Sequence, residues 1–326
     1  MNNKYSVATT EKEARQQILN IMENYSKNMD EMLEFLKFQS RFYQYSARNT
    51  MLIYMQNMGA MLCQSFKAWG KEQVDGKPIK ILKGQHGMKI LVPTTVTIVT
   101  LPDGTTKGLF YCTAEEKEKV KSGELESKKR TKFKIGTTFD IAQTDYPADK
   151  YPERLNRGRV SADHAKCFTA LKTYSENTMN IPFFIGDTEE EINGAGLFGF
   201  CRCDLNGKRE IHLARNLKDT QLLSVGGHEF GHAVLHGIDC EKSTARKEVE
   251  ADMFGILLDL HFGLPIENTR KNHLSDNFKE LTAEVTKGVK SEEVEKVRQK
   301  AIADAFNNVN KAYREHIDKI DKLIEE

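Results

Sequence analysis

The sequence predicts an α+β protein with two domains, residues 1–150 and residues 151–326. A length of 326 residues suits two domains of roughly 150 residues each. Helical and strand-like periodicities are mixed along the chain, which indicates an α+β class. A Pro-punctuated segment, residues 145–153, marks the boundary between the two halves.

The N-terminal domain is expected to combine helices with β-hairpins. Apolar residues recur at helical spacing near the start of the chain, and Ser46 is a natural N-cap. The expected elements are a helix over residues 11–37, a helix from Ser46 to Gly59, strands within 79–101 with turns at Gly84 and Gly87, a hairpin turn at Asp103–Gly104, a charge-rich exposed helix or mobile loop over 115–132, and a strand over 133–143.

The C-terminal domain is expected to place a small sheet ahead of two apolar helices. A hairpin signal at Asp204–Gly207 joins two of its strands. The expected elements are a helix over residues 161–176, strands at 181–185, 197–203 and 210–213, apolar helices around 222–235 and 248–260, and a charged C-terminal helical extension over 282–326.

Composition points to a globular protein without a membrane span. Hydrophobic residues make up 39% of the chain and charged residues 29%, which is typical of soluble domains. The chain has no run of about 18 apolar residues, and Met1–Tyr5 lack an apolar signal core. Six cysteines without dense spacing fit a reducing compartment. We therefore expect a cytoplasmic protein with no membrane partner.

Positive charge is concentrated in the first half of the chain. Residues 1–155 hold 24 Lys and Arg against 18 Asp and Glu, whereas the remainder holds 24 against 29. Six lysines lie between Lys67 and Lys89, close to Phe66 and Trp69. Cations beside aromatic rings suit single-stranded nucleic acid, although lysine-rich turns are usually just solvated and a tryptophan is usually in a core. The first half is expected to meet a polyanion.

The segment His228–His232 reads H-E-F-G-H within an apolar stretch. Two histidines four residues apart share one helix face, so two imidazole nitrogens can bind one tetrahedral Zn²⁺. Glu229 between them can take a proton from a water that such a metal activates. Gly226 and Gly227 directly before the motif cost helix stability and indicate either a late helix start or a close backbone approach.

A catalytic zinc site needs a third protein ligand. His236 repeats the four-residue step but lies about 12 Å along the helix axis from His228, so a supporting, substrate-side or plain helix-end role is expected. Glu248 and Asp252 lie four residues apart on the next apolar helix. This spacing favours Glu248 over Glu250 as the ligand and Asp252 as the acceptor of a ligand histidine's N–H. The alternative is that the glutamates are ordinary helix-surface acids.

The two stretches HEFGHAVLH and EVEADMFGILL resemble the ImmA/IrrE-like metallopeptidases, which have a zincin fold. The resemblance implies that His228, His232 and Glu248 bind Zn²⁺. It also implies that Glu229 is the general base and that Asp252 hydrogen-bonds a ligand histidine and holds it in place. The chain would then be a zinc metallopeptidase of the H-E-x-x-H type with glutamate as third ligand.

The expected reaction is hydrolysis of a peptide bond. Zn²⁺ would lower the pKa of its water to about 7, and Glu229 would carry the proton to the leaving amine. A donor to the developing oxyanion is also needed. His261 and Tyr174 are considered for that role.

Three segments of the first half, Ser46–Gln56, Phe66–Trp69 and Ile81–Pro93, resemble the N-terminal domain of ArdC-type antirestriction proteins and of related LtrC-like proteins. Residues 138–144 resemble a strand of the same domain. The family joins this domain to a C-terminal zincin, so the resemblance covers most of residues 10–265. The insertion at 115–132 does not belong to the family pattern.

That resemblance implies single-stranded DNA binding, carriage on a conjugative plasmid or integrative element, and protection of entering DNA from host restriction. Arg48 and Asn49 could equally be structural, capping a helix or holding the hairpin. The positions carried over as DNA contacts are Arg48, Asn49, Trp69, Lys83 and Lys89.

Three functions remain open from the sequence. The first is a DNA-associated metallopeptidase of a mobile element that acts on a host or mobile-element protein. The second is a protein that coats single-stranded DNA and whose zincin domain is not catalytic; the intact Glu229 argues against it. The third is a regulatory protease that cleaves a repressor and whose first domain binds protein rather than DNA.

Overall fold

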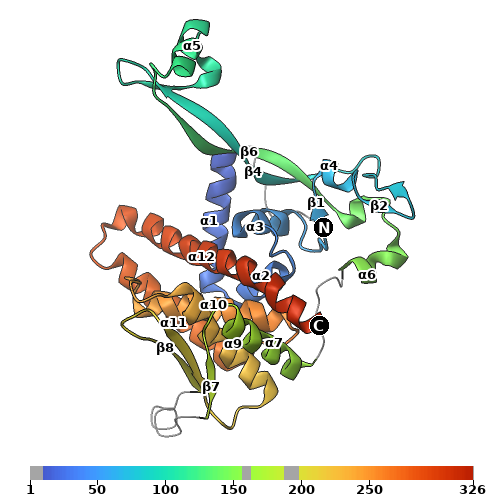
Figure 1. The fold of residues 1–326 in the computed structure, drawn as a ribbon, viewed down its shortest axis with the longest axis vertical. Helices are drawn as coiled ribbons and strands as arrows, with labels where there is room; N and C mark the ends of the chain where they lie inside the picture. The colour runs from blue at the N-terminus through green and yellow to red at the C-terminus, as the bar shows by residue number, and fades with distance from the viewer. Residues whose placement is uncertain (1–9, 156–162, 187–197, 326) are drawn as a thin grey trace.

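The structure, a computed structural model, describes residues 10–155, 163–186 and 198–325 (Figure 1). It mixes helices with small sheets, so the predicted α+β class is confirmed. A helical body carries the small sheets, and a long hairpin projects from one end of that body (Figure 1). None of the described helices is both long and apolar enough to cross a membrane.

The first half of the chain contains three packed helices, an antiparallel sheet of order β1-β6-β4-β5, and a small β2–β3 hairpin. In chain order its elements are α1 (Glu11–Lys27), α2 (Met29–Arg41), α3 (Ala47–Gln56), β1 (Cys63–Gln64), α4 (Phe66–Trp69), β2 (Gln73–Val74), β3 (Lys77–Pro78), β4 (Met88–Thr100), β5 (Thr106–Gly108), η1 (Leu109–Tyr111), α5 (Ala114–Ser122), β6 (Ser127–Asp140), η2 (Ile141–Gln143), η3 (Ala148–Lys150) and α6 (Tyr151–Leu155).

The second half contains a three-stranded sheet of order β7-β9-β8 and five helices among its described residues. β7 runs parallel to β9, and β8 is an antiparallel edge strand. In chain order the elements are α7 (His164–Asn177), β7 (Phe183–Ile185), β8 (Gly199–Cys203), β9 (Arg209–Leu213), α9 (Asp219–Leu235), α10 (Thr244–His261), α11 (Asn268–Thr286) and α12 (Ser291–Glu325). The predicted starts at residues 161 and 197 lie outside the described residues.

Several expected boundaries in the first half differ from the structure. The strand expected over 133–143 ends at Asp140, and residues 141–143 form the 3-10 helix η2. The helix expected over 11–37 is broken at Asn28, because its side chain accepts a hydrogen bond from the backbone N–H of Glu31 and caps α2. The charge-rich segment does form an exposed helix, α5. However, β6 begins at Ser127, so basic residues 128–132 lie in a strand because they pair with the apolar strand β4.

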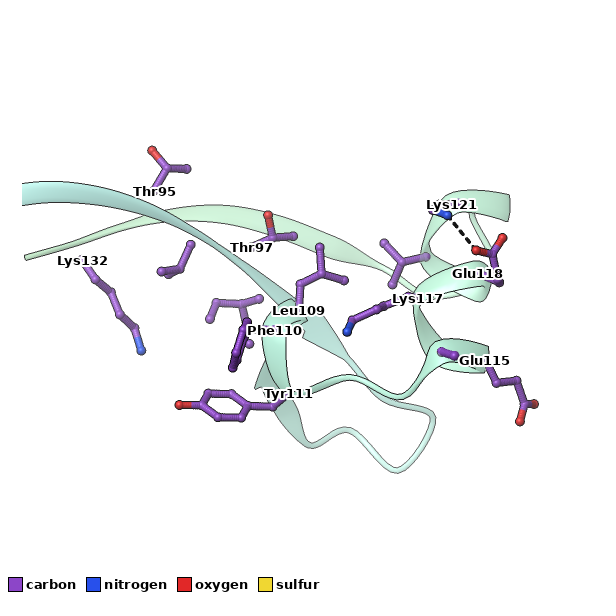
Figure 2. Close-up of a pocket in the computed structure, with 15 residues that line it drawn as sticks. Thr95, Thr97, Leu109, Phe110, Tyr111, Glu115, Lys117, Glu118, Lys121 and Lys132 are labelled. Carbon is purple, nitrogen blue, oxygen red and sulfur yellow. Dashed lines mark hydrogen bonds and ion pairs between the residues drawn. The ribbon is translucent and has the colours of Figure 1, made fainter.

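β4 and β6 form a continuous ladder from the Met88–Thr138 pair to the Val99–Ser127 pair. Val92 and Phe133 still pack against the core of the body, and beyond them the ladder projects outward. We call residues 92–134 the arm; Figure 2 shows its outer end. The arm has a small core of its own, made by Val99, Cys112 and Leu125.

One edge of β4 faces α3, and side chains of α3 make the backbone hydrogen bonds that a neighbouring strand would make there. Asn49 donates to the carbonyl oxygen of Leu91 at 2.9 Å and accepts from its N–H at 2.8 Å. Gln56 likewise donates to the carbonyl oxygen of Lys89 at 2.8 Å and accepts from its N–H at 2.7 Å. Backbone groups left without partners in a buried edge are costly, so these two amides fix the hairpin on the helical body.

One hydrophobic core extends through both halves of the chain. Phe35 of α2 and Phe306 of α12 lie with their ring centroids 6.0 Å apart. Buried Glu23 of α1 accepts hydrogen bonds from Arg298 and Gln299 of α12. Apolar residues from before and after residue 150 belong to this one cluster, so the core itself does not divide the chain there. The domain boundary near residue 150 stays a prediction.

α12 is an integral core helix, which corrects the expected C-terminal extension. Its buried residues recur every three or four positions, which places them on one face. The charged residues between them cover the opposite face and conceal this pattern in a simple composition count. The buried residues include Ile302, Phe306, Val309, Tyr313, Ile317 and Ile320.

We expect Asn49→Ala to destabilise the protein, because it leaves both backbone groups of Leu91 without partners. The cost should be about 1–3 kcal/mol in the free energy of unfolding, measured by chemical denaturation. The exposed Gln44→Ala is a control that should change this free energy by less than about 0.5 kcal/mol. Equal stability of the two variants would contradict the structural role of Asn49.

Candidate metal centre

The centre depends on how closely α9 and α10 cross. Glycines line the crossing: a Cβ at Gly255 would lie 3.1 Å from the backbone nitrogen of His228, and one at Gly231 would lie 3.3 Å from Cα of Ala251. α9 begins at Asp219, so Gly226 and Gly227 lie inside it and the late helix start is wrong. At Gly227 a Cβ would lie 3.8 Å from the backbone Cα of Gly255 and 3.3 Å from the Leu258 side chain, both on α10, so the close backbone approach is confirmed.

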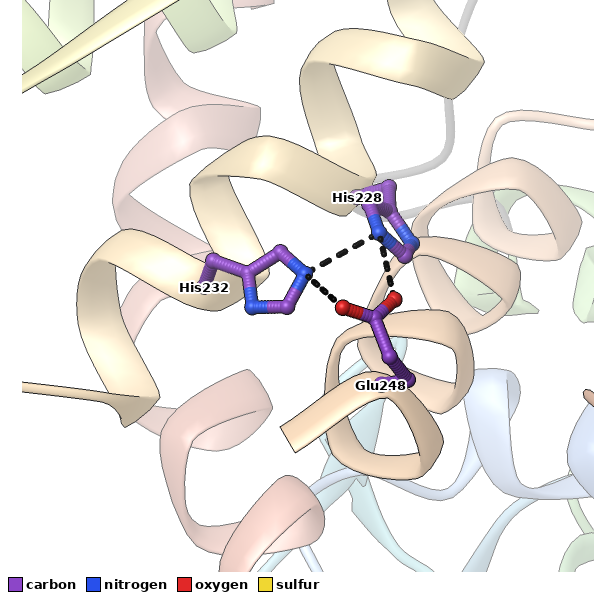
Figure 3. Close-up of side chains that lie close together, drawn as sticks. All are labelled: His228, His232 and Glu248. Atoms are coloured by element: carbon purple, nitrogen blue, oxygen red, sulfur yellow. Dashed lines mark hydrogen bonds and ion pairs between the residues drawn. The ribbon is translucent and has the colours of Figure 1, made fainter. Parts of the chain in front are cut away.

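Three side chains converge from the two helices (Figure 3). His228 and His232 of α9 have their Nε2 atoms 3.1 Å apart. The carboxylate of Glu248 on α10 lies 3.5 Å from His228 Nε2 and 3.4 Å from His232 Nε2. Ligands bound at about 2.0–2.1 Å to a tetrahedral ion lie about 3.3 Å from one another. The three predicted ligands therefore meet with the spacing that a zinc ion requires.

Asp252 orients the first histidine. Its Oδ1 atom lies 3.0 Å from His228 Nδ1, which leaves Nε2 free to face the other two predicted ligands. Oδ2 of the same carboxylate lies 2.8 Å from His273 Nδ1 and accepts from Asn277 at 3.2 Å. The sequence reasoning missed His273 and Asn277, because they come from α11 and only the tertiary packing brings them to Asp252.

His236 and Glu250 orient the second histidine. His232 Nδ1 lies 3.1 Å from His236 Nδ1, and His236 Nε2 lies 3.1 Å from Glu250. His236 thus has the supporting position that its spacing indicated. Glu250 is fully buried and also accepts from Lys242, Arg246 and Asn308, so it is no surface acid.

Burial and neighbouring charges shift the pKa values of the side chains in the centre. Burial raises the pKa of Glu229, which suits a base that must take up a proton near neutral pH. Burial would also raise the pKa of Glu248, but hydrogen bonds with the two histidines hold it well below its usual range. Burial would lower the pKa of His228, but the Asp252 and Glu248 carboxylates raise it to about 10.

Strand β8 passes close to the predicted base. Burial, together with the Glu229 carboxylate, raises the pKa of Cys201 to about 12. β8 packs against α9 and forms the outer edge of its sheet. An extended segment could therefore pair with this edge beside the three ligands.

The two residues considered as oxyanion donors are engaged by other partners, which corrects that expectation. Tyr174 is buried and its hydroxyl lies 2.8 Å from His316 Nδ1, among core aromatic rings. His261 is at the end of α10 and is held by Asp321 at 3.0 Å. Their sequence positions gave no information on distance from the histidine pair.

The predicted DNA contacts separate into structural and exposed positions. Trp69 is fully buried and donates to the carbonyl of Phe139 at 2.9 Å, so it cannot stack on a base and that prediction is corrected. Both polar groups of the Asn49 amide are engaged by β4. Arg48 is partly buried beside Arg15, and Lys89 is partly buried beside Gln56. Lys83 is exposed, and its role as a contact stays a prediction.

Phe66 is the aromatic side chain that the structure exposes on α4, at 68% of its full surface. It contacts Phe139 edge-to-face, with ring centroids 6.3 Å apart. The four-residue helix turns Phe66 outward and Trp69 inward, which propensity alone does not decide.

No protein-family model matches the chain. The uncharacterized protein pXO2-81 of Bacillus anthracis is 28% identical over 266 residues, which are 78% of this chain and 44% of that protein. The chain therefore spans less than half the length of this curated relative. Among solved structures, the chain is similar to the metal-free antirestriction protein ArdC from plasmid R388, with a TM-score of 0.42, 14% identity, and 86% and 84% of the two chains covered.

We expect purified protein to bind one Zn²⁺ per chain and Glu248→Ala to lose it, because two histidines alone form an incomplete site. Asp252→Asn should weaken zinc binding by about 10–100-fold, since it removes the acceptor that orients His228. Metal content by mass spectrometry and competition with a chelator measure both effects. Glu280→Ala, an exposed change on α11, is the control; zinc retained in full by Glu248→Ala would contradict the ligand assignment.

Zinc affinity should rise with pH between about pH 6 and pH 8. The raised pKa of His228 means that its ring holds a proton in this range, and that proton must leave when a metal binds. Displacement of one proton gives about tenfold tighter binding per pH unit. Asp252→Asn lowers the pKa of His228 and should flatten this dependence; an equally steep slope in both proteins would contradict the explanation.

Proposed function

We propose that the chain is a zinc-dependent peptidase joined to a region that binds single-stranded DNA, and that it serves a mobile element in antirestriction. The observation that carries the peptidase part is the triangle of His228, His232 and Glu248 with buried Glu229 beside it. The DNA part rests on the order of the ArdC-type motifs and on the excess of cations in the first half.

The residues of the centre divide the chemistry between them. Zn²⁺ held by the three ligands would activate water and polarise a carbonyl group. Glu229 accepts the proton of the attacking water and then donates it to the leaving amine. Asp252 and His236 keep each ligand histidine in the tautomer that presents Nε2 to the metal.

The substrate would bind as an extended peptide along β8. Free backbone groups on an edge strand can pair with such a segment, which would then run past Glu229. His273, which is about half exposed and fixed by Asp252, is the side chain we propose to face the developing negative charge on the carbonyl oxygen. Hydrogen bonding with Asp252 raises the pKa of His273, which favours the protonated form that can donate.

A paired test of wild type and Glu229→Gln separates the possible functions. The variant should keep zinc and single-stranded DNA binding, because Glu229 is neither a ligand nor part of the DNA-binding half. Cleavage of fluorescent casein should fall by about 10²–10⁴-fold, the usual contribution of a general base. Glu280→Gln provides the matched control with the same change of charge on an exposed surface.

Protection of DNA from a restriction nuclease is then measured with the same proteins. Loss of protection in Glu229→Gln would support a working peptidase in antirestriction. Equal protection by both proteins would overturn that role and favour coating of single-stranded DNA. Hydrolysis without any binding of single strands would instead favour a regulatory protease.

A further inference from the structure

The outer surface of the arm carries a row of cations. Lys128, Arg130, Lys132 and Lys134 alternate along β6, so their side chains share one face of the ladder, at intervals of about 6.6–6.8 Å. All four are exposed. The row spans about 20 Å along a narrow two-stranded ribbon that stands clear of the body (Figure 1).

Most of this row is not neutralised by neighbouring acids. Lys128 pairs with Glu126, but Arg130, Lys132 and Lys134 form no side-chain ion pair within the described part of the chain. Three acids at the tip are already paired with lysines: Glu115 with Lys119, Glu116 with Lys107, and Glu118 with Lys121. The other two tip acids, Asp103 and Glu124, accept hydrogen bonds from Thr105 and Ser122. A row of solvated cations without counter-charges favours a polyanionic partner.

Two aromatic rings lie beside the row, exposed to solvent. Phe110 and Tyr111 of η1 expose 87% and 77% of their surfaces and contact each other edge-to-face at 5.5 Å. They line a cavity of about 920 Å³ together with Val96, Ile98 and Lys132. Figure 2 shows Lys132 and Tyr111 on one side of the two strands, with Thr95 and Thr97 on the other.

We propose that this face of the arm binds single-stranded DNA, with bases stacked on Phe110 and Tyr111 and phosphates paired with Arg130, Lys132 and Lys134. Exposed rings and a linear row of cations suit a single strand, whose bases are free to stack, better than a duplex, whose bases are covered. The ligand class is the one in the proposed function, but the surface is a different one. It lies in the segment that the ArdC-type motifs do not cover.

The test uses the full-length protein and fluorescently labelled oligo(dT) of about 20 nucleotides, with binding followed by anisotropy at several salt concentrations. The triple variant Arg130→Gln, Lys132→Gln, Lys134→Gln should weaken binding and reduce the slope of log Kd against log salt by about 2. The pair Phe110→Ala, Tyr111→Ala should weaken binding by at least about fivefold with little change in that slope.

A charge-matched control removes three exposed lysines outside the arm, in α11 and the turn before α12, with Lys279→Gln, Lys287→Gln and Lys290→Gln. It should bind oligo(dT) like wild type. Unchanged thermal melting and zinc content show that each variant is folded. These two readouts keep a folding defect separate from a binding defect.

Binding of both arm variants at wild-type affinity would overturn the arm proposal while leaving the proposed function intact. No binding by wild type would overturn both. Wild-type binding to vesicles of phosphatidylglycerol that is lost in the arm variants, with oligo(dT) binding unchanged, would overturn the proposal in favour of an anionic membrane surface. Weaker binding of both arm variants to oligo(dT), with the control unchanged, would support it.

Discussion

The close crossing of α9 and α10 is the constraint on which the candidate centre depends. Two histidines on one helix can face a metal by themselves, but the third ligand must come from elsewhere. Glycine at positions 231 and 255 lets backbone meet backbone, so a glutamate of ordinary length reaches both imidazoles. Metal sites tolerate distance errors of only about 0.2 Å, whereas one added methyl group forces neighbouring atoms to move by more than that at Gly255.

Around this crossing, each candidate ligand histidine is supported by a buried carboxylate. Asp252 supports His228 directly, and Glu250 supports His232 through His236. Buried carboxylates are costly unless they are fully paired. The structure meets that cost with partners from several helices: His273 and Asn277 of α11 for Asp252, and Arg246 and Asn308 for Glu250. The residues that support the centre thus come from several helices and extend well beyond the H-E-x-x-H motif.

Sequence reasoning succeeded where a local rule decides the geometry. Four-residue spacing on an apolar helix placed His228 with His232 and Glu248 with Asp252, and serine at an N-cap position marked the start of α3. It failed where distant packing decides. Nothing local shows that Trp69 turns inward, that the Asn49 amide completes a strand edge, or that the charged C-terminal residues cover an apolar face of α12. His273 belongs to the same class, because its partner lies 21 residues away on another helix.

The continuous core has a thermodynamic consequence. α1 and α2 pack on α12, and α12 also donates to buried Glu250 through Asn308 and accepts from Arg246 at Ala301. Unfolding of the N-terminal helices would therefore uncover the supports of the second histidine. Any ligand that binds only the native state stabilises everything that unfolds together with its site. A ligand bound to one half of the molecule would thus protect the other half from proteolysis, without any change of shape passing between them.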